Sequence, residues 1–343
     1  MKILTIGYIG NGKSTNRYHT PFVLTRKDKI KIKTIYRRNP DHDSWAKIPG
    51  VNYTTDLNDL YNDPEIDLIC VCTSTNHYEV AKDVLMHGKN CLVEKPFVNT
   101  YAQAKELFDL AKEKGLFVQA YQNRRFDSDF LTAQKVIESG VLGDLLEVEM
   151  GFDYFRPEIP YSMKGKNVSP YRSYLYGHAC HTLDQVISYF GKPDSVHYDV
   201  RQLLGEGSYN DYFDLDLYYG VLKVSVKSSY FRIKQRPSFT IYGTKGMFIH
   251  EKKDKQEYHL KLFYLPADHE DFGKDLPEDY GTLTYVDDQG VYHEEKVPTV
   301  DGDYARVYDD IYEAIVNGKP KTITDEQTLL QMEMLEKGIS YLK

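Results

Sequence analysis

The first 122 residues alternate short apolar runs with helical segments, and this alternation restricts the possible fold more than any other feature of the chain. Such a pattern is typical of βαβ units whose parallel sheet is buried on both faces. The helix before the last run begins with a capping box, Thr100 and Gln103, and Gly115 stands where it should end. The predicted strands are 2–9, 30–37, 66–73, 90–94 and 116–121.

The hydrophobic period changes from Leu145 onward. Apolar residues then alternate with polar ones over 145–154 and 213–219, and the segment 239–249 predicts a hairpin around Gly243 and Gly246. We therefore expect an α/β protein with a doubly wound parallel sheet in residues 1–122. Residues 123–343 should form an α/β domain with a largely antiparallel open sheet.

Composition narrows the class of partner. The chain has 343 residues, and 43 Lys and Arg against 51 Asp and Glu leave a net charge of -8. This charge argues against nucleic-acid binding, which relies on phosphate neutralisation. Four scattered cysteines, the absence of a signal-like N-terminus and the absence of a long apolar run favour a cytoplasmic protein that does not bind membranes. A small-molecule partner is the expectation.

A glycine-rich turn follows the first predicted strand. Gly10 and Gly12 stand where a dinucleotide fingerprint has its first two glycines, whereas Thr15 replaces the third. Glycines there allow a tight turn and a close approach of backbone N–H groups, here including those of Lys13 and Ser14, to a pyrophosphate. An ordinary turn is the alternative interpretation.

The same segment also satisfies the pattern of a nucleoside-triphosphate loop, from Gly7 to Gly12-Lys13-Ser14. In that interpretation the loop should begin just after the strand and lead into a long helix. Tyr8 and Ile9 instead continue the strand, and Pro21 leaves little room for the helix. The dinucleotide interpretation is therefore favoured.

The end of the second predicted strand bears on the choice of cofactor. An acid is typical there for NAD, whereas arginine suits the 2′-phosphate of NADP. The sequence has Arg37 and Arg38 at this point, which favours NADP over NAD. Two solvated surface arginines are the alternative.

Glu94-Lys95-Pro96 follows the fourth predicted strand, at the sheet edge where open α/β sheets bind ligands. Lys95 could share the proton of a substrate hydroxyl, and Glu94 could position Lys95 or the cofactor ribose. As a bare tripeptide, Glu-Lys-Pro is more often a surface turn.

These motifs together resemble the Gfo/Idh/MocA family of oxidoreductases, named for glucose-fructose oxidoreductase and inositol 2-dehydrogenase. The resemblance rests on the segments 9–14 with His19, 81–96, 121–127, 155–158 and the hairpin at Tyr242-Gly243. It is greatest to the branch with NADP-dependent scyllo-inositol dehydrogenases and uncharacterised bacterial relatives. It implies a Rossmann domain, a second α/β domain whose open sheet often forms the oligomer interface, and hydride transfer to or from a sugar or polyol.

The segment 174–190 predicts a helix with one buried stripe. The family places a histidine on such a helix, facing the cleft, with an aspartate one turn earlier. His181 matches the histidine, whereas Gly177 occupies the aspartate position, and Asp184 could replace that carboxylate only in part. His178 could line the substrate pocket or simply pack.

Two other interpretations of this helix stay open: structural histidines, and a metal site formed by His178, His181 and Asp184. The metal site is disfavoured because i, i+3 and i+6 rotate around a helix and no fourth ligand is apparent. We therefore expect no metal.

The hypothesis from the sequence is that a substrate carbinol lies between Lys95 and His181. His181 then acts as the acid or base that exchanges the hydroxyl proton. We further expect cofactor contacts from Thr73 and His77, and assembly into a homodimer or homotetramer. A non-catalytic NADP-binding regulator is the rival, favoured by Gly177. The expected substrate contacts are Asn123, Tyr154, Arg172, His178 and Asp184.

Overall fold

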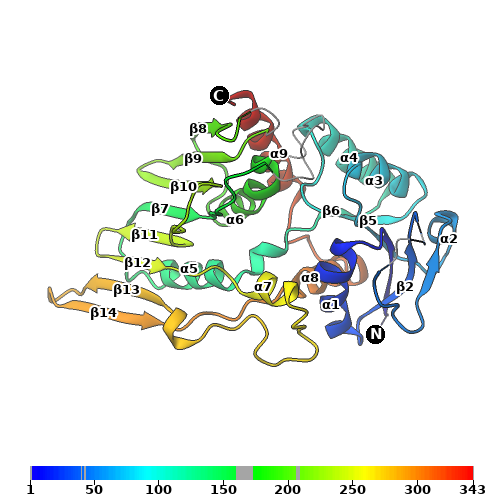
Figure 1. The fold of residues 1–343 in the computed structure, drawn as a ribbon, viewed down its shortest axis with the longest axis horizontal. Coiled ribbons are helices and arrows are strands. Elements are labelled where there is room, and N and C mark those ends of the chain that lie inside the picture. The colour runs from blue at the N-terminus through cyan, green and yellow to red at the C-terminus, as the bar shows by residue number, and fades with distance from the viewer. Residues whose placement is uncertain (1, 40, 42–43, 160–172, 206–208, 343) are drawn as a thin grey trace. The chain divides into compact units, whose positions relative to one another are not determined.

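The structure is a computed structural model that describes residues 2–39, 41, 44–159, 173–205 and 209–342 (Figure 1). Its chain forms two compact units. Unit 1 comprises 1–123, 258–272 and 304–332, and unit 2 comprises 124–257, 273–303 and 333–343. A single boundary near residue 122 therefore does not describe the compact units, because two later segments return to unit 1.

Unit 1 contains a six-stranded parallel sheet in the order β3-β2-β1-β4-β5-β6. Every residue of β1 and β4 is buried, as expected for strands covered on both faces. The doubly wound parallel sheet predicted from the alternating runs is confirmed. Its strands are β1 (Leu4–Ile9), β2 (Ile30–Tyr36), β3 (Asn52–Thr54), β4 (Leu68–Val71), β5 (Asn90–Val93) and β6 (Val118–Ala120).

The helical elements described before α3 in this unit are at most six residues long. Helix α4 follows the capping prediction: Thr100 Oγ1 accepts from the Gln103 backbone N–H at 3.2 Å, and Gly115 ends the helix with φ +65°. The helices are η1 (Ser14–His19), α1 (Thr20–Val23), η2 (Leu24–Arg26), α2 (Asn58–Tyr61), α3 (His77–Met86), α4 (Tyr101–Lys114) and α8 (Arg306–Asn317). A further helix, α9 (Asp325–Ser340), continues from this unit into unit 2.

Unit 2 contains an eight-stranded sheet in the order β14-β13-β12-β11-β7-β10-β9-β8. Among its described strands, β7 and β10 pair in parallel and the other neighbours pair antiparallel, so the largely antiparallel sheet is confirmed, as is the β11–β12 hairpin. Its strands are β7 (Leu145–Gly151), β8 (Ser195–Arg201), β9 (Tyr212–Tyr219), β10 (Leu222–Ser229), β11 (Phe239–Gly243), β12 (Gly246–His250), β13 (Gly281–Val286) and β14 (Tyr292–Val297).

Side-chain alternation explains how this sheet contributes to the core. Phe213, Leu215 and Leu217 of β9 are fully buried, whereas the residues between them are partly exposed. The same unit includes η4 (Asn123–Phe126) except its first residue, α5 (Ser128–Glu138), η7 (Leu175–Ala179), α6 (Cys180–Phe190) and η8 (Pro277–Asp279). The helix α7 (Gln256–Lys261) begins in unit 2 and continues into unit 1 from Tyr258.

Throughout the described segments, none of the helices combines the length and the apolar character that crossing a bilayer requires.

Candidate active site

The turn after β1 requires glycine at one position and leaves open space at another. Gly10 has φ +118°, and a Cβ added there would lie 2.6 Å from the carbonyl oxygen of Cys72. A Cβ added at Gly12 would meet no heavy atom within 4 Å. The backbone of Gly12 is therefore open to the close approach of a ligand.

Thr15, in place of the third glycine, supports this turn. Its side chain is fully buried, and Oγ1 donates to the carbonyl oxygen of Gly10 at 2.6 Å. Gly7 lies inside β1, so no loop begins just after the strand there, and the geometry does not fit a triphosphate loop. The expectation that Pro21 leaves little room for a helix is wrong, because helical backbone continues from Ser14 through Pro21 to Arg26.

A cavity of about 930 Å³ lies at the carboxyl ends of β1, β2 and β4. This is the edge of an open α/β sheet where the strand order reverses and ligands bind. The volume is within the range of small-molecule sites. The predicted residues Gly10, Gly12, Lys13, Ser14, Arg38 and Thr73 line it, together with Ile9, Asn11, Tyr36, Leu57, Tyr61, Cys72, Ser74, Thr75, Asn76, Glu79, Val80 and Asp83.

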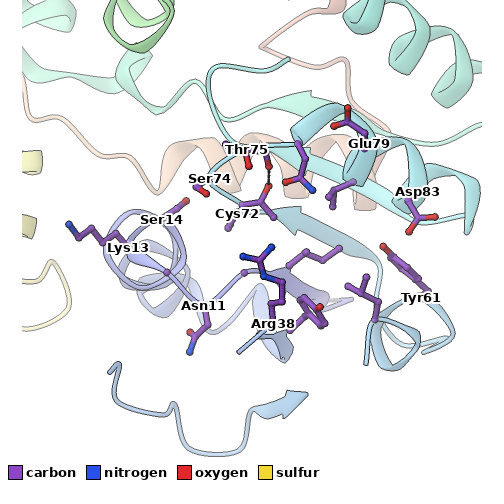
Figure 2. A pocket seen from close by; sticks show the side chains of 18 residues that line it. Asn11, Lys13, Ser14, Arg38, Tyr61, Cys72, Ser74, Thr75, Glu79 and Asp83 are labelled. Carbon is purple, nitrogen blue, oxygen red and sulfur yellow. Dashed lines mark hydrogen bonds between the residues drawn. The ribbon is translucent and has the colours of Figure 1, made fainter. Parts of the chain in front are cut away.

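The two candidate arginines differ in their surroundings. Figure 2 shows the Arg38 guanidinium directed into the space between the glycine turn and the Cys72–Thr75 segment. Arg37 is absent from the described lining, and its guanidinium carbon lies 5.8 Å from the ring centre of Tyr53. Arg38 thus lies at the cavity, whereas the cofactor contact expected from Arg37 stays a prediction.

Glu94 is buried beneath the glycine turn. Its carboxylate accepts from the Ser14 hydroxyl and, at 2.9 Å, from the backbone N–H of Lys95. His19 Nε2 lies 3.0 Å from the same carboxylate. Burial raises the pKa of Glu94, but the His19 hydrogen bond and charge, with Lys95 and Ser14, outweigh it and lower the pKa to about 2. The charged Glu94 carboxylate thus binds the glycine turn through Ser14 and the Glu-Lys-Pro segment through the backbone of Lys95.

His19 completes this buried network. Burial opposes its protonation, but Cys72 and Glu94 raise its pKa to about 10. Its other nitrogen lies 2.5 Å from the hydroxyl of Tyr308 on α8, and its ring stacks on Tyr121 at 4.0 Å. The return of α8 to unit 1 was missed by sequence reasoning, because no local signal links residues 289 positions apart.

His77 connects two segments beside the cavity. The side chain is buried, and both ring nitrogens lie 2.8 Å from carbonyl oxygens, Nδ1 from that of Pro96 and Nε2 from that of Thr73. The ring therefore ties the Glu-Lys-Pro segment to the cavity wall at Thr73, while the predicted cofactor contact from His77 stays a prediction.

In unit 2, the predicted histidine helix is a π-helical turn, η7, followed by α6. The face that carries His181 and Asp184 is also buried, at 5% and 2% exposure. Both oxygens of Asp184 accept from Arg125, at 2.7 and 2.8 Å. The Asp184 carboxylate is therefore engaged by Arg125 in this structure, and the predicted substrate contact from Asp184 stays a prediction.

Five ring side chains of unit 2 lie together in an aromatic cluster: Phe152, Tyr154, Tyr174, His178 and Tyr230. His178 lies at its centre, with ring centroids 4.3 Å from Tyr174 and 5.1 Å from Tyr154. The cluster brings together the predicted substrate residues Tyr154 and His178.

Asn123 is buried at the beginning of η4, and Arg172 lies outside the described residues. Lys253, whose ammonium lies against the aromatic cluster, was not predicted because it follows β12, about 100 residues away in the sequence.

The chain belongs to the Gfo/Idh/MocA family of oxidoreductases. The family model for the NAD-binding Rossmann fold matches residues 4–122, and that for the C-terminal alpha/beta domain matches residues 134–340.

Among its relatives is the uncharacterized oxidoreductase YhhX of Escherichia coli K12, which is 46% identical over 98% of this chain and 96% of its own length. A crystal structure of YhhX has a TM-score of 0.92 at 45% identity, covering 98% and 97% of the two chains. The scyllo-inositol 2-dehydrogenase (NADP(+)) IolW of Bacillus subtilis is 30% identical over 99% of this chain and 94% of its own.

Proposed function

We propose that this protein is an NADP-dependent dehydrogenase acting on CH–OH groups. It would move a hydride between nicotinamide and a secondary alcohol or ketone of a sugar, inositol or related polyol. The observation that carries the cofactor assignment is Arg38, which follows β2 and lines the cavity. NAD enzymes typically have an acid there, whereas a guanidinium suits the 2′-phosphate of NADP.

The residues of the cavity fit such a cofactor. The open approach at Gly12 allows a pyrophosphate close to the backbone, and Lys13, Ser14 and Thr73 supply polar groups around it. In Figure 2 the Lys13 side chain extends away from the other labelled residues, so its backbone rather than its ammonium would contribute.

The nicotinamide supplies the hydride acceptor or donor when bound. The proton chemistry is assigned to Lys95 and His181. During oxidation His181 would accept the proton of the substrate hydroxyl while Lys95 hydrogen-bonds the same oxygen. Glu94 positions Lys95 through its backbone N–H. General acid-base assistance of this kind contributes typically about 10²- to 10⁴-fold.

The polyol assignment is supported by the relative named as a scyllo-inositol dehydrogenase and by the aromatic cluster. Phenols have an apolar face and a polar tip, which suits a ring that carries many hydroxyl groups.

The test combines binding and turnover. NADPH and NADH binding is measured by fluorescence, and turnover is measured on inositols, aldoses, sugar acids and their ketones. Preferential NADPH binding with turnover of at least one polyol is expected. Tight NADPH binding without turnover on any member would favour the rival, a non-catalytic regulator, which Gly177 supports.

A further inference from the structure

Lys253 is a partly buried cation beside the aromatic cluster. Its ammonium donates to the backbone carbonyl of Asp153 at 2.9 Å and lies 4.1 Å from the ring centre of Phe152 and 4.9 Å from that of Tyr154. Among the described residues, no carboxylate oxygen lies within 4 Å of it as an ion-pair partner. An ammonium has three N–H donors, so it can accept further partners.

The neighbouring carboxylates are engaged elsewhere. Asp153 binds the Arg236 guanidinium through both oxygens, at 2.7 and 2.9 Å. Glu257 pairs with Arg124. Asp129 accepts from the backbone N–H of Phe130 at 2.9 Å. Lys253 is therefore near several charges without being neutralised by a direct pair.

This environment disfavours the protonated, charged form of Lys253. Burial, with the like charge of Arg124, lowers its pKa to about 8, although Asp153, Asp129 and Glu257 oppose the shift. A bound anion would restore the stability of the ammonium. Such a site gains more from an anionic ligand than an exposed lysine would.

Tyr154 connects Lys253 to the cluster. Burial raises the pKa of Tyr154, so its phenol stays protonated and can donate a hydrogen bond. Its ring also contacts His178 and, with a centroid-to-Cζ distance of 4.3 Å, the Arg156 guanidinium. The Lys253 ammonium and the Arg156 guanidinium therefore both lie near the ring of Tyr154.

We propose that Lys253, Tyr154 and His178 form a subsite for the carboxylate of a sugar acid, so that the substrate is an acidic rather than a neutral polyol. This inference rests on the proposed function. A carboxylate fits because the Lys253 ammonium balances a single negative charge, whereas the Arg156 guanidinium lies over the ring of Tyr154. Arg124, the other strong candidate cation, is occupied by Asp127 and Glu257.

The first experiment compares ligands on the NADPH-loaded wild type. Calorimetry measures binding of gluconate and glucuronate, of the neutral compounds glucose and inositol, and of a sugar phosphate. The carboxylates should bind at least about tenfold more tightly than the neutral sugars. Equal affinity for neutral and acidic sugars would overturn the subsite, and so would a preference for the phosphate.

The second experiment compares variants. Lys253→Met should weaken carboxylate binding about 10- to 100-fold, with glucose binding unchanged. Lys253→Arg should retain most of the affinity, and Lys252→Met, at an exposed neighbour, should behave as wild type. Thermal melts verify that each variant is folded. If Lys253→Met binds carboxylates as wild type does, the inference is wrong, and should that variant not fold, failure of Lys253→Arg to retain affinity overturns it.

Binding should also depend on pH. Because the free ammonium loses its proton near the lowered pKa, carboxylate affinity should fall as the pH rises through about 8 in the wild type but not in Lys253→Met. Carboxylate binding without turnover would sink the proposed function and leave the subsite standing. Turnover of neutral polyols by a protein that does not bind carboxylates would overturn the subsite and leave the proposed function standing.

Discussion

The cavity of unit 1 and the aromatic cluster of unit 2 are built in different ways. The cavity is formed largely by backbone turns after β1 and β4, and its carboxylate anchor, Glu94, is paired with His19. The aromatic cluster is formed by side chains that follow β7, that begin or lie in η7, and that follow β10, with a cation that lacks a paired carboxylate among the described residues. The carboxylate of unit 1 therefore already has its cation, whereas the Lys253 ammonium of unit 2 has no carboxylate partner among the described residues.

Replacing His181 should have the largest effect. His181→Ala is expected to lower kcat about 10²- to 10⁴-fold because the proton acceptor is lost, while NADPH affinity, a property of unit 1, stays the same. Steady-state kinetics and fluorescence titration measure the two quantities. An unchanged kcat would remove His181 from the mechanism.

Breaking the buried ion pair should be the next largest effect. His19→Gln leaves Glu94 charged and buried without its cation, which should lower the free energy of unfolding by about 3–5 kcal/mol. Denaturant unfolding at neutral pH measures this, with the exposed His87→Gln as control. A loss below 1 kcal/mol would contradict the pairing.

The same pair predicts a pH dependence. The pKa of His19 is raised, so its contribution is complete below about 6.5 and is lost as the pH rises through about 10. The pKa of Glu94 is lowered, so its contribution is lost as the pH falls from about 4.5 through about 2. The stability difference between wild type and His19→Gln should therefore shrink toward pH 10, and a difference that grows there would contradict the assignment.

Replacing each of the two arginines in turn should affect NADPH binding and NADH binding differently. Arg38→Ala should weaken NADPH binding about 10- to 100-fold and leave NADH binding nearly unchanged, because only NADPH has the 2′-phosphate. Arg37→Ala, which removes the guanidinium beside Tyr53, is the matched control and should lose little. The opposite ranking of the two variants would move the phosphate contact to Arg37.

Restoring the missing carboxylate should have the smallest effect. Gly177 has open space where a Cβ would be added, so Gly177→Asp can place a carboxylate one turn before His181. A nearby anion favours the protonated imidazole, so the acidic limb of the kcat pH profile should move to higher pH, with kcat changing less than about tenfold. Gly177→Asn is the neutral control, and identical profiles for the two would contradict the role given to His181.

The two regions also differ in how far sequence predicts them. Gly10 and Gly12 could be predicted because the turn they form is local and depends on backbone conformation. The parallel sheet followed from apolar runs, and the antiparallel sheet followed from alternation along β9. These signals are short in range.

The missed residues, and the predicted ones whose surroundings differ from expectation, depend on contacts between distant segments. Asp184 was assigned to the substrate because nothing in the sequence indicates that Arg125, 59 positions away, binds it. His77 was assigned to the cofactor for its place after β4, yet its ring binds carbonyl oxygens on both sides. Lys253 appears in the sequence as one of several lysines after β12, and only packing distinguishes it.

The most direct measurement is the consumption of NADPH by wild type and His181→Ala with keto-sugars and keto-sugar acids under identical conditions. Wild type should oxidise NADPH with at least one member, and His181→Ala should bind NADPH equally well and oxidise it at least about a hundredfold more slowly. Wild-type protein that binds NADPH and oxidises it with no member of either class would contradict the proposed redox function.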